Sequence, residues 1–231
     1  MGNPSMSLRV NVDRIVEGRE LFDVYLSELL EWNNKFNLTS IIEPKDVILK
    51  HFIDSLSVAK AYDFSHPGLK VIDIGTGAGF PGLPLKIAFP QIQLTLLEAT
   101  KKKTEFLKEV VAKLGLSDVE VVWGRAEDKA AEFRSQFDVV LARAVARLPV
   151  LLELCLPYIK VGGVFIAQKE DASEIPSAEN ALKILGGQIS KVDSFLLPSS
   201  ELKRTLIVVS KIAETPEKYP RRAGIPAKRP L

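Results

Sequence analysis

The sequence has few of the residues that form disulfides or bind transition metals. It contains one cysteine, Cys155, and two histidines, His51 and His66, which lie fifteen residues apart. A single cysteine excludes an internal disulfide, and the histidine spacing matches no metal-ligand motif, so we expect no metal site. Cys155 stands in the apolar stretch 151–157, which favours a buried side chain and fits a reducing compartment.

The sequence also lacks the signals of membrane or secreted proteins. It has no run of about 18 apolar residues and no signal-peptide pattern. Its net charge is only +2, which gives no overall basic field to attract nucleic acid, although residues 218–231 are rich in Lys and Arg and contain no acid. We expect a soluble, cytoplasmic, monomeric protein without a membrane partner.

Two patterns of apolar residues follow each other along the chain. Up to residue 66, helical spacing predicts one helix over residues 19–36 and a second that starts at Pro44 and is closed by Pro67-Gly68. After Lys70, short apolar strands alternate with helices, as is typical of a parallel sheet covered on both faces. The predicted strands are residues 71–74, 94–98, 119–123, 137–142, 164–168, 189–197 and 205–212, and the predicted helices are residues 82–89, 101–114, 127–133, 148–159 and 176–185.

The last two strands are too close in sequence for a helical crossover, so they should pair antiparallel. A mostly parallel seven-stranded α/β sheet with an antiparallel terminal hairpin is typical of the class I, Rossmann-like, S-adenosylmethionine-dependent methyltransferases. We expect three segments: an N-terminal helical extension over residues 1–66, a methyltransferase domain over residues 67–212, and a basic, proline-rich tail over residues 213–231. The prolines of the tail predict no regular structure there.

Residues 71–82 read VIDIGTGAGFPG, an apolar strand followed by an acid and then by closely spaced glycines. Such a turn lets a ligand approach the backbone. Asp73 before the turn is unfavourable for a pyrophosphate but suits the ammonium and sulfonium of S-adenosylmethionine. Glu98 ends the next strand, 23 residues after Gly75, where a carboxylate can bind ribose hydroxyls of either S-adenosylmethionine or a dinucleotide. We therefore expect S-adenosylmethionine as cofactor.

Three alternatives remain open at this point. An NAD-dependent oxidoreductase is one, because residues 77–82 match G-x-G-x-x-G; however, Gly75 follows the strand directly and the sixth residue counted from it is Phe80, not glycine. A non-catalytic RNA-binding module on the same fold is the second. It is disfavoured because four glycines in one turn lower local stability, a cost that the close approach of a ligand would offset. Methylation of a small molecule or a protein is the third, since a fold does not fix its substrate.

Six strings make the chain resemble the RsmG (GidB) family, bacterial methyltransferases that act on N7 of a guanine in 16S ribosomal RNA. They run from about residue 20 into the basic tail and so cover nearly the whole chain. One position departs from the family pattern, because Glu170 follows Lys169 where the family tends to have glycine. The strings are WNNKFNLT (32–39), HFIDSL (51–56), DIGTGAGFPG (73–82), RAE (125–127), ARAVA (142–146) and YPRRAGIP (219–226).

The resemblance implies a partner, 16S rRNA or an assembling small ribosomal subunit, and a set of cofactor contacts. Arg143 ends the fourth strand, where a side chain faces the ligand crevice, and is the candidate catalytic residue that orients the base or a nearby phosphate. Glu127 also fits an acid that interacts favourably with a helix N-terminus. The predicted cofactor-binding residues are Asp73, Gly75, Gly77, Phe80, Glu98, Ala99, Thr100, Ala126, Glu127 and Arg143.

We expect no general base, because N7 of guanine carries a free lone pair and positioning suffices. The fourth strand lacks the Asn/Asp-Pro-Pro-aromatic signature, and Cys155 lies mid-helix in the pattern. For His51 we favour packing over RNA contact. The predicted RNA-binding residues are Arg147, Lys169, Arg204, Arg221 and Arg222, with Lys35, Lys50, Lys101, Lys102, Lys103, Lys228 and Arg229 as further candidates; the pairs on the flexible tail are the strongest.

Overall fold

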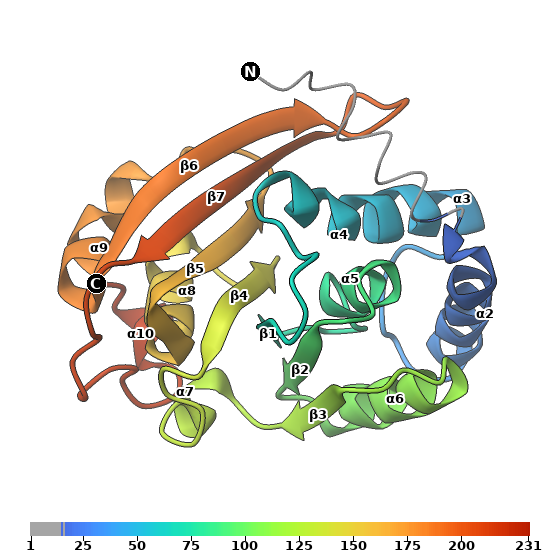
Figure 1. The fold of residues 1–231 in the computed structure, drawn as a ribbon, viewed down its shortest axis with the longest axis horizontal. Helices are drawn as coiled ribbons and strands as arrows, with labels where there is room; N and C mark the ends of the chain where they lie inside the picture. The colour runs from blue at the N-terminus through green and yellow to red at the C-terminus, as the bar shows by residue number, and fades with distance from the viewer. Residues whose placement is uncertain (1–14, 16) are drawn as a thin grey trace.

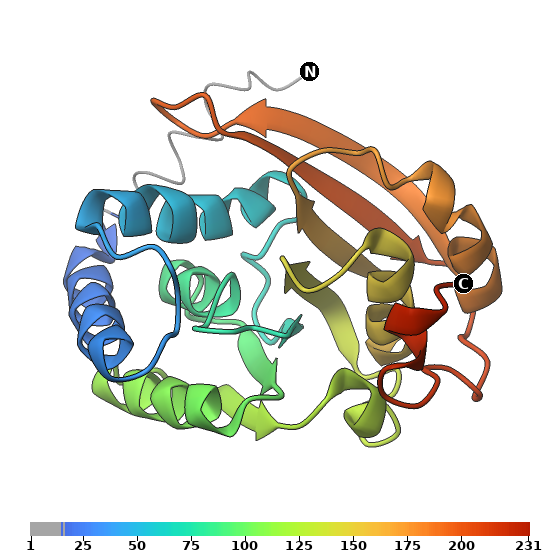
Figure 2. The same cartoon turned by 180° about the vertical axis from the view of Figure 1, so that it is seen from behind.

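The computed structural model describes residue 15 and residues 17–231, which form a seven-stranded sheet with helices on both faces (Figure 1, Figure 2). The strand order is β3-β2-β1-β4-β5-β7-β6. Strands β1 to β5 run parallel, and β7 runs antiparallel to both β5 and β6, as predicted. The strands are β1 (Lys70–Ile74), β2 (Gln93–Glu98), β3 (Val119–Trp123), β4 (Phe137–Arg143), β5 (Ile159–Lys169), β6 (Gly187–Leu196) and β7 (Lys203–Lys211).

None of the helices in the described part of the chain is long and apolar enough to cross a membrane. Three short 3₁₀ turns and one π-helix accompany the α-helices. The α-helices are α2 (Arg19–Lys35), α3 (Pro44–Val47), α4 (Asp54–Leu56), α5 (Gly82–Ala88), α6 (Lys101–Lys113), α7 (Ala126–Lys129), α8 (Leu148–Cys155), α9 (Glu179–Leu185) and α10 (Ile225–Lys228); the π-helix is Ile48–Ile53, and the 3₁₀ turns are Ser57–Lys60, Leu156–Tyr158 and Pro176–Ala178.

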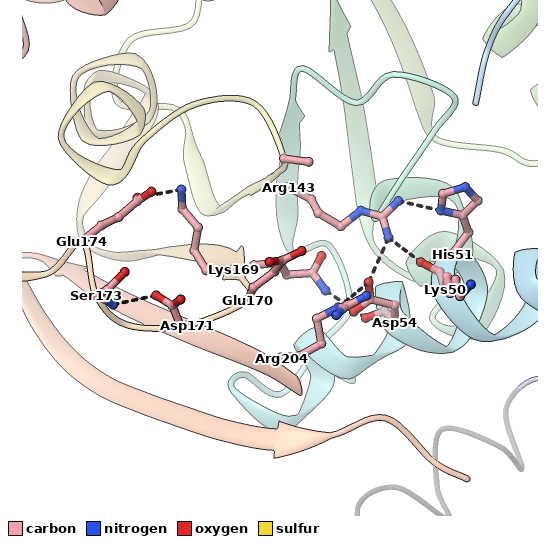
Figure 3. Close-up of a pocket in the computed structure, with 12 residues that line it drawn as sticks. Lys50, His51, Asp54, Arg143, Lys169, Glu170, Asp171, Ser173, Glu174 and Arg204 are labelled. Carbon is pink, nitrogen blue, oxygen red and sulfur yellow. Dashed lines mark hydrogen bonds and ion pairs between the residues drawn. The ribbon is translucent and has the colours of Figure 1, made fainter. Parts of the chain in front are cut away.

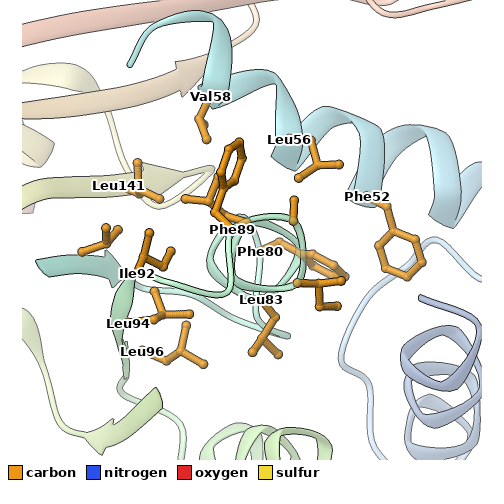
Figure 4. Close-up of a cluster of buried hydrophobic side chains, with 14 of the residues drawn as sticks. Phe52, Leu56, Val58, Phe80, Leu83, Phe89, Ile92, Leu94, Leu96 and Leu141 are labelled. Carbon is orange, nitrogen blue, oxygen red and sulfur yellow. The ribbon is translucent and has the colours of Figure 1, made fainter. Parts of the chain in front are cut away.

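Side chains alternate along each strand, and this alternation divides the core into two clusters, one on each face of the sheet. In β1, Val71 belongs to the cluster on the side of α2, α5 and α6, whereas Ile72 belongs to the cluster on the side of α8 and α9. Asp73 therefore lies on the first face, where it is close to Gly82, the first residue of α5. Figure 4 shows part of that first cluster, which joins Phe52 of the helical extension to Leu96 of β2.

The helical extension is packed on the first face and shares its core. The Trp32 ring of α2 meets the Phe106 ring of α6 edge-on, with centroids 5.7 Å apart. Lys113 of α6 pairs with Glu28 of α2 at 2.7 Å. The Tyr25 hydroxyl donates to the carbonyl of Ala78 in the glycine-rich turn. Through these contacts α2 holds the glycine-rich turn in place. The division of the chain into three segments stays a prediction.

The second helix of the extension differs from its prediction. It runs from Pro44 to Lys60 rather than to Pro67, and its middle residues 48–53 are π-helical. The apolar periodicity could not reveal the π-helix, because a wider i→i+5 turn shifts the phase of the pattern only locally. An Asx turn follows a few residues later, in which the amide of Ser65 donates to Asp63 Oδ1 at 2.9 Å.

The tail is packed against the domain, so the prediction of a flexible segment was wrong. The prediction that it has no regular structure was wrong only for the short helix α10. Arg221 donates to buried Glu153 from Nε to Oε1 (2.8 Å), from Nη2 to Oε2 (2.6 Å) and from its backbone amide to Oε1 (2.8 Å). Arg134 donates to the carbonyl of Thr215 at 3.2 Å. Helix α10 forms because Pro226 lies in its first turn, where the missing amide hydrogen has no helical partner to lose.

Three other boundaries differ from the prediction by a few residues. Strand β5 begins at Ile159 rather than at residue 164, because Gly162 and Gly163 interrupt the apolar pattern that would have shown it. Helix α8 ends at Cys155 and passes into a 3₁₀ turn that contains Pro157. Helix α7 covers Ala126–Lys129 rather than residues 127–133.

The packing of the tail predicts different effects for its two adjacent arginines. Arg221→Ala should lower the free energy of unfolding by about 3 kcal/mol, because the buried Glu153 carboxylate loses its guanidinium partner and keeps only the backbone amide of residue 221. Arg222→Ala, at an exposed position beside it, should change that free energy by less than about 0.5 kcal/mol. Urea unfolding followed by circular dichroism measures both. Equal midpoints for the two variants would contradict the packed tail.

Candidate functional site

The glycine-rich turn after β1 is held from below by Asp73, which is fully buried. Its Oδ2 accepts hydrogen bonds from the Thr76 hydroxyl at 2.6 Å and from the backbone amide of Gly82 at 2.8 Å. Within the described residues, Oδ1 has no hydrogen-bond partner. Burial raises the pKa of Asp73 to about 6, against the lowering effect of the two hydrogen bonds. At neutral pH a negative charge therefore lies beneath the turn.

Glu98, at the end of β2, holds the turn from the side. Its Oε2 accepts from the amide of Gly77 at 3.0 Å, and its Oε1 accepts from the amide of Thr100 at 2.7 Å. The residue is only 7% exposed. Each carboxylate oxygen retains a further lone pair, so the carboxylate can still accept hydrogen bonds from a pair of ribose hydroxyls. Glu98, a predicted cofactor-binding residue, thus positions two others, Gly77 and Thr100.

Two positions in the turn require glycine for steric reasons as well as for their positive φ. Gly75 has φ +69°, and a Cβ there would lie 2.8 Å from Cγ2 of Val145. Gly79 has φ +100°, and a Cβ there would lie 2.6 Å from the Tyr25 hydroxyl. Gly77, at φ +63°, faces open space. The turn is therefore closed in by neighbours on two sides and open at its middle glycine.

A cavity of about 230 Å³, here called the glycine crevice, lies at the carboxyl ends of β1, β2 and β3. Four predicted cofactor residues line it, and the segment after β4 and the tail complete its wall. Glu127 also accepts from the amide of Gly224 at 3.2 Å, which ties the tail to α7 beside the crevice. The residues that line it include Gly75, Ala99, Ala126, Glu127, Val145, Ala146, Pro226 and Ala227.

A second cavity of about 470 Å³, here called the β4–β5 cavity, lies at the carboxyl ends of β4 and β5 (Figure 3). The helical extension contributes Lys50, His51 and Asp54 to its lining, and the strands contribute Arg143, Gln168 and Arg204. The two cavities flank one short segment. Arg143 and Ala144 line the β4–β5 cavity, and the next two residues line the glycine crevice.

Arg143 lies in the β4–β5 cavity and does not line the glycine crevice. Its Nη1 donates to the Lys50 carbonyl at 3.2 Å and to Asp54 Oδ2 at 3.3 Å, and its Nη2 lies 3.2 Å from His51 Nδ1. The guanidinium stands over the ring of Phe80, 5.2 Å from its centroid. The ion pair with Asp54 fixes Arg143 at the end of β4, and its contact with the cofactor stays a prediction.

His51 and Phe80 form the floor that positions this arginine. Their rings stack with centroids 4.4 Å apart, and His51 Nε2 lies 2.9 Å from the Thr39 hydroxyl. Burial, assisted by the charge of Arg143, lowers the pKa of His51 to about 4. The ring is therefore neutral at pH 7: Nδ1 accepts from Arg143 and Nε2 donates to Thr39. His51 packs, as favoured from the sequence, and Phe80 does not line the glycine crevice.

The predicted RNA-binding residues fall into two groups. Lys169 donates to the Ala146 carbonyl at 2.7 Å and pairs with Glu174 at 2.8 Å. Arg204 donates to Asp54 at 3.0 Å, and Arg221 is held by Glu153. These three hold partners inside the molecule. Arg147 and Arg222 are exposed and need break no ion pair given by the structure in order to meet a phosphate.

Sequence reasoning missed two residues of the β4–β5 cavity, Asp54 and Gln168. Asp54 lies within the string HFIDSL, which supported the family resemblance without an assigned role. Gln168 directly precedes Lys169, and it pairs in register with Arg143 across β4 and β5. The alternation of side chains along the two strands was the available signal, because it places Gln168 and Arg143 on the same face.

The strand order, the reversed β7 and the glycine turn at the carboxyl edge define a class I methyltransferase fold. Solved structures agree. A precorrin-6y C5,15-methyltransferase from Geobacter metallireducens has a TM-score of 0.52 at 16% identity and covers 76% of this chain and 91% of that one. A variant of MtNAS in complex with S-adenosylmethionine has a TM-score of 0.55 at 18% identity and covers 88% and 77%. At these identities the likeness shows the fold alone.

Sequence comparison gives the family. The model of the rRNA small subunit methyltransferase G (GidB) family matches residues 19–205. The ribosomal RNA small subunit methyltransferase G of Acetivibrio thermocellus is 48% identical over 225 residues, 96% of this chain and 91% of that protein. That of Alkaliphilus oremlandii is 51% identical over 211 residues, 90% and 88% respectively. The chain belongs to the rRNA small subunit methyltransferase G family, which decides against the NAD-dependent oxidoreductase.

The buried His51 predicts a specific loss of stability in acid. Its pKa is about 4 in the folded protein and about 6.5 when unfolded, so the unfolded chain binds more protons between these values. The free energy of unfolding should fall by about 3 kcal/mol from this group alone as the pH drops from 7 to 4. Asp73 acts with the opposite sign in part of this range, because its pKa is raised, and it contributes equally to wild type and variant.

The measurement compares His51→Gln with wild type by urea unfolding at several pH values. The difference between the two should change across this range, with the wild type losing more stability on acidification. His66→Gln, at an exposed histidine, is the matched control and should parallel the wild type. Parallel curves for His51→Gln and wild type would refute a neutral, buried His51.

Proposed function

We propose that this protein transfers a methyl group from S-adenosylmethionine to N7 of a guanine in 16S rRNA, free or within an assembling small ribosomal subunit. One observation carries the proposal: the glycine crevice and the β4–β5 cavity lie on either side of residues 143–146. A donor in the first and a nucleotide in the second would meet at the carboxyl edge of the sheet, where α/β folds bind their ligands.

The residues around the glycine crevice fit the donor. Asp73, buried beneath the turn, has an ionised carboxylate whose Oδ1 lacks a partner among the described residues, and its negative charge favours an ammonium group in the crevice. Glu98 can accept from the ribose hydroxyls. Gly75 has no Cβ, so the methionine end can pass close to the backbone. When bound, S-adenosylmethionine supplies an electrophilic methyl group on a sulfonium that is already a good leaving group.

The residues of the β4–β5 cavity fit a reaction that needs no general base. Guanine N7 presents a free lone pair, so the protein has only to position it. His51 is neutral and both of its ring nitrogens are engaged, which leaves no base there. Arg143 uses three of its five N–H groups on Lys50, Asp54 and His51, and the other two remain to orient a base or a phosphate.

The RNA surface is proposed on charge and exposure. Arg147 is the N-cap residue of α8 and directly follows residues 143–146, and Arg222 lies on the packed tail. Both are exposed and can contact phosphates without leaving a buried acid unpaired. A rigid tail presents Arg222 at a fixed place, which suits a structured RNA better than a flexible arm would.

The test is methyl transfer in vitro from radiolabelled S-adenosylmethionine to 16S rRNA and to small subunits from a strain that lacks this modification. We expect label in one guanosine, mapped to N7 by cleavage of the methylated strand, and none when 7-deazaguanosine replaces that nucleotide. Label on another atom, on protein alone or on a small molecule would overturn the proposed substrate. Absence of transfer to any of these would favour the non-catalytic module.

The role of Glu98 predicts a binding defect. Glu98→Ala should raise the dissociation constant for S-adenosylmethionine by about tenfold to a hundredfold, because charge-assisted hydrogen bonds to the donor are lost. It should also lower the free energy of unfolding by about 1–2 kcal/mol, since two backbone amides lose their acceptor, while the protein stays folded. Calorimetric titration and thermal melting measure the two effects.

Glu120→Ala is the matched control, because Glu120 is an exposed glutamate on β3 away from the glycine crevice. It should leave the affinity for S-adenosylmethionine unchanged. If Glu98→Ala binds the donor as tightly as Glu120→Ala does, the ribose contact is wrong.

A further inference from the structure

Two buried oxygen atoms of the β4–β5 cavity lack a hydrogen bond to any described residue: Asp54 Oδ1 and Gln168 Oε1. Asp54 is 3% exposed and Gln168 is 4% exposed, and both residues line the cavity. An unpartnered buried acceptor costs about 1–3 kcal/mol, so two of them in one cavity call for an explanation. A ligand that donates hydrogen bonds provides one.

The structure fixes both atoms as acceptors. The other oxygen of Asp54, Oδ2, already accepts from Arg143 Nη1 at 3.3 Å and from Arg204 Nε at 3.0 Å. Gln168 Nε2 donates to the Asp54 carbonyl at 2.8 Å and to the Ser57 hydroxyl at 3.3 Å. Turning the Gln168 amide over would set its oxygen against that carbonyl, so Oε1 is the free end.

The surroundings restrict what the ligand can be. The guanidinium groups of Arg143 and Arg204 lie beside Asp54, so a metal cation would be repelled. A phosphate offers only acceptors and cannot satisfy two further acceptors. A neutral group with adjacent N–H donors meets both conditions. The cavity volume of about 470 Å³ lies within the roughly 300–1,000 Å³ typical of small-molecule sites, so it has room for a nucleobase.

Among the four RNA bases, only guanine has neighbouring donors, N1–H and N2–H₂, on its Watson–Crick edge. Adenine and cytosine each present one amino donor beside a ring acceptor, and uracil presents one N–H between two carbonyls. Proteins that read unpaired bases do so along this edge, after the base has left its stack. A guanine held by N1–H and N2–H₂ has its N7, on the other ring, turned away from the two acceptors.

We propose that the β4–β5 cavity is the base-reading pocket, in which Asp54 Oδ1 and Gln168 Oε1 accept hydrogen bonds from the Watson–Crick edge of the target guanine. This assignment rests on the proposed function, because it names the residues that select the nucleotide for methyl transfer. Both residues are specificity-determining: they touch the base but take no part in the displacement at N7.

The experiment uses two synthetic rRNAs that carry guanosine or inosine at the methylated position, assayed with the full-length protein. Inosine keeps N1–H and N7 but lacks the N2 amino group. The wild type should methylate the guanosine RNA with a kcat/KM about tenfold to a hundredfold above that for the inosine RNA. Because inosine lacks only the N2 amino group, this ratio should fall to within about threefold of one in whichever of Gln168→Met and Asp54→Asn removes the acceptor of that group.

Comparing ratios separates reading of the base from other effects. The intrinsic difference in N7 reactivity between the two nucleosides is the same for every variant and cancels. A purely structural role for Gln168 would lower both rates and leave the ratio unchanged. Gln136→Met is the matched control, since the exposed Gln136 also donates to a backbone carbonyl, that of Glu132, at 2.7 Å. It should keep the wild-type ratio.

Thermal melting identifies any variant that does not fold. If Asp54→Asn does not fold, Gln168→Met still tests the pocket, because it leaves the ion pairs of Asp54 in place. Wild-type ratios in both folded variants, or a wild type that does not discriminate, would overturn the proposal. Equilibrium binding of the same two RNAs gives the comparison without methyl transfer. A protein that discriminates in binding but transfers no methyl group would refute the proposed function and keep the base-reading pocket.

Discussion

The carboxyl edge of the sheet depends on the hydrogen bonds made by one buried carboxylate oxygen. Asp73 Oδ2 accepts from Thr76 within the turn and from Gly82 at the start of α5, and so closes the chain from β1 into that helix. Burying a charged group is unfavourable unless it is hydrogen-bonded, and these two bonds offset part of that cost. Two neighbours then hold the turn: Glu98 on β2 accepts from the amide of Gly77, and the Tyr25 hydroxyl on α2 donates to the carbonyl of Ala78.

The sheet and the helical extension contribute to different cavities. The central strands supply the glycine crevice, whose features suit a charged nucleoside donor. The helical extension supplies one wall of the β4–β5 cavity, through the π-helix and the residue that follows it. Arg143 joins the two parts, because it ends a strand of the sheet and is held by Lys50, His51 and Asp54 of the extension. The extension is therefore part of the site and not an accessory to it.

The sequence predicted what local patterns control. The strands of the sheet follow from apolar alternation and turn residues, and the glycine turn with Asp73 and Glu98 follows from spacing along two neighbouring strands. The prediction failed where partners are distant in sequence. The contact between Arg221 and Glu153 spans 68 residues, and that between Arg204 and Asp54 spans 150, so no local pattern marks either. For the same reason, the prediction of a flexible tail was wrong and the acceptor Asp54 was missed.

The wall that Pro226 and Ala227 give to the glycine crevice has a consequence for the order in which the protein becomes competent. A ribosome makes these two residues after all seven strands. Domains begin to fold during synthesis, from the N-terminal side. A nascent chain that has completed its sheet but not α10 therefore has an incomplete glycine crevice, with Glu127 still lacking the amide of Gly224. The crevice is thus formed in full only after residues 224–227 have been synthesised and packed.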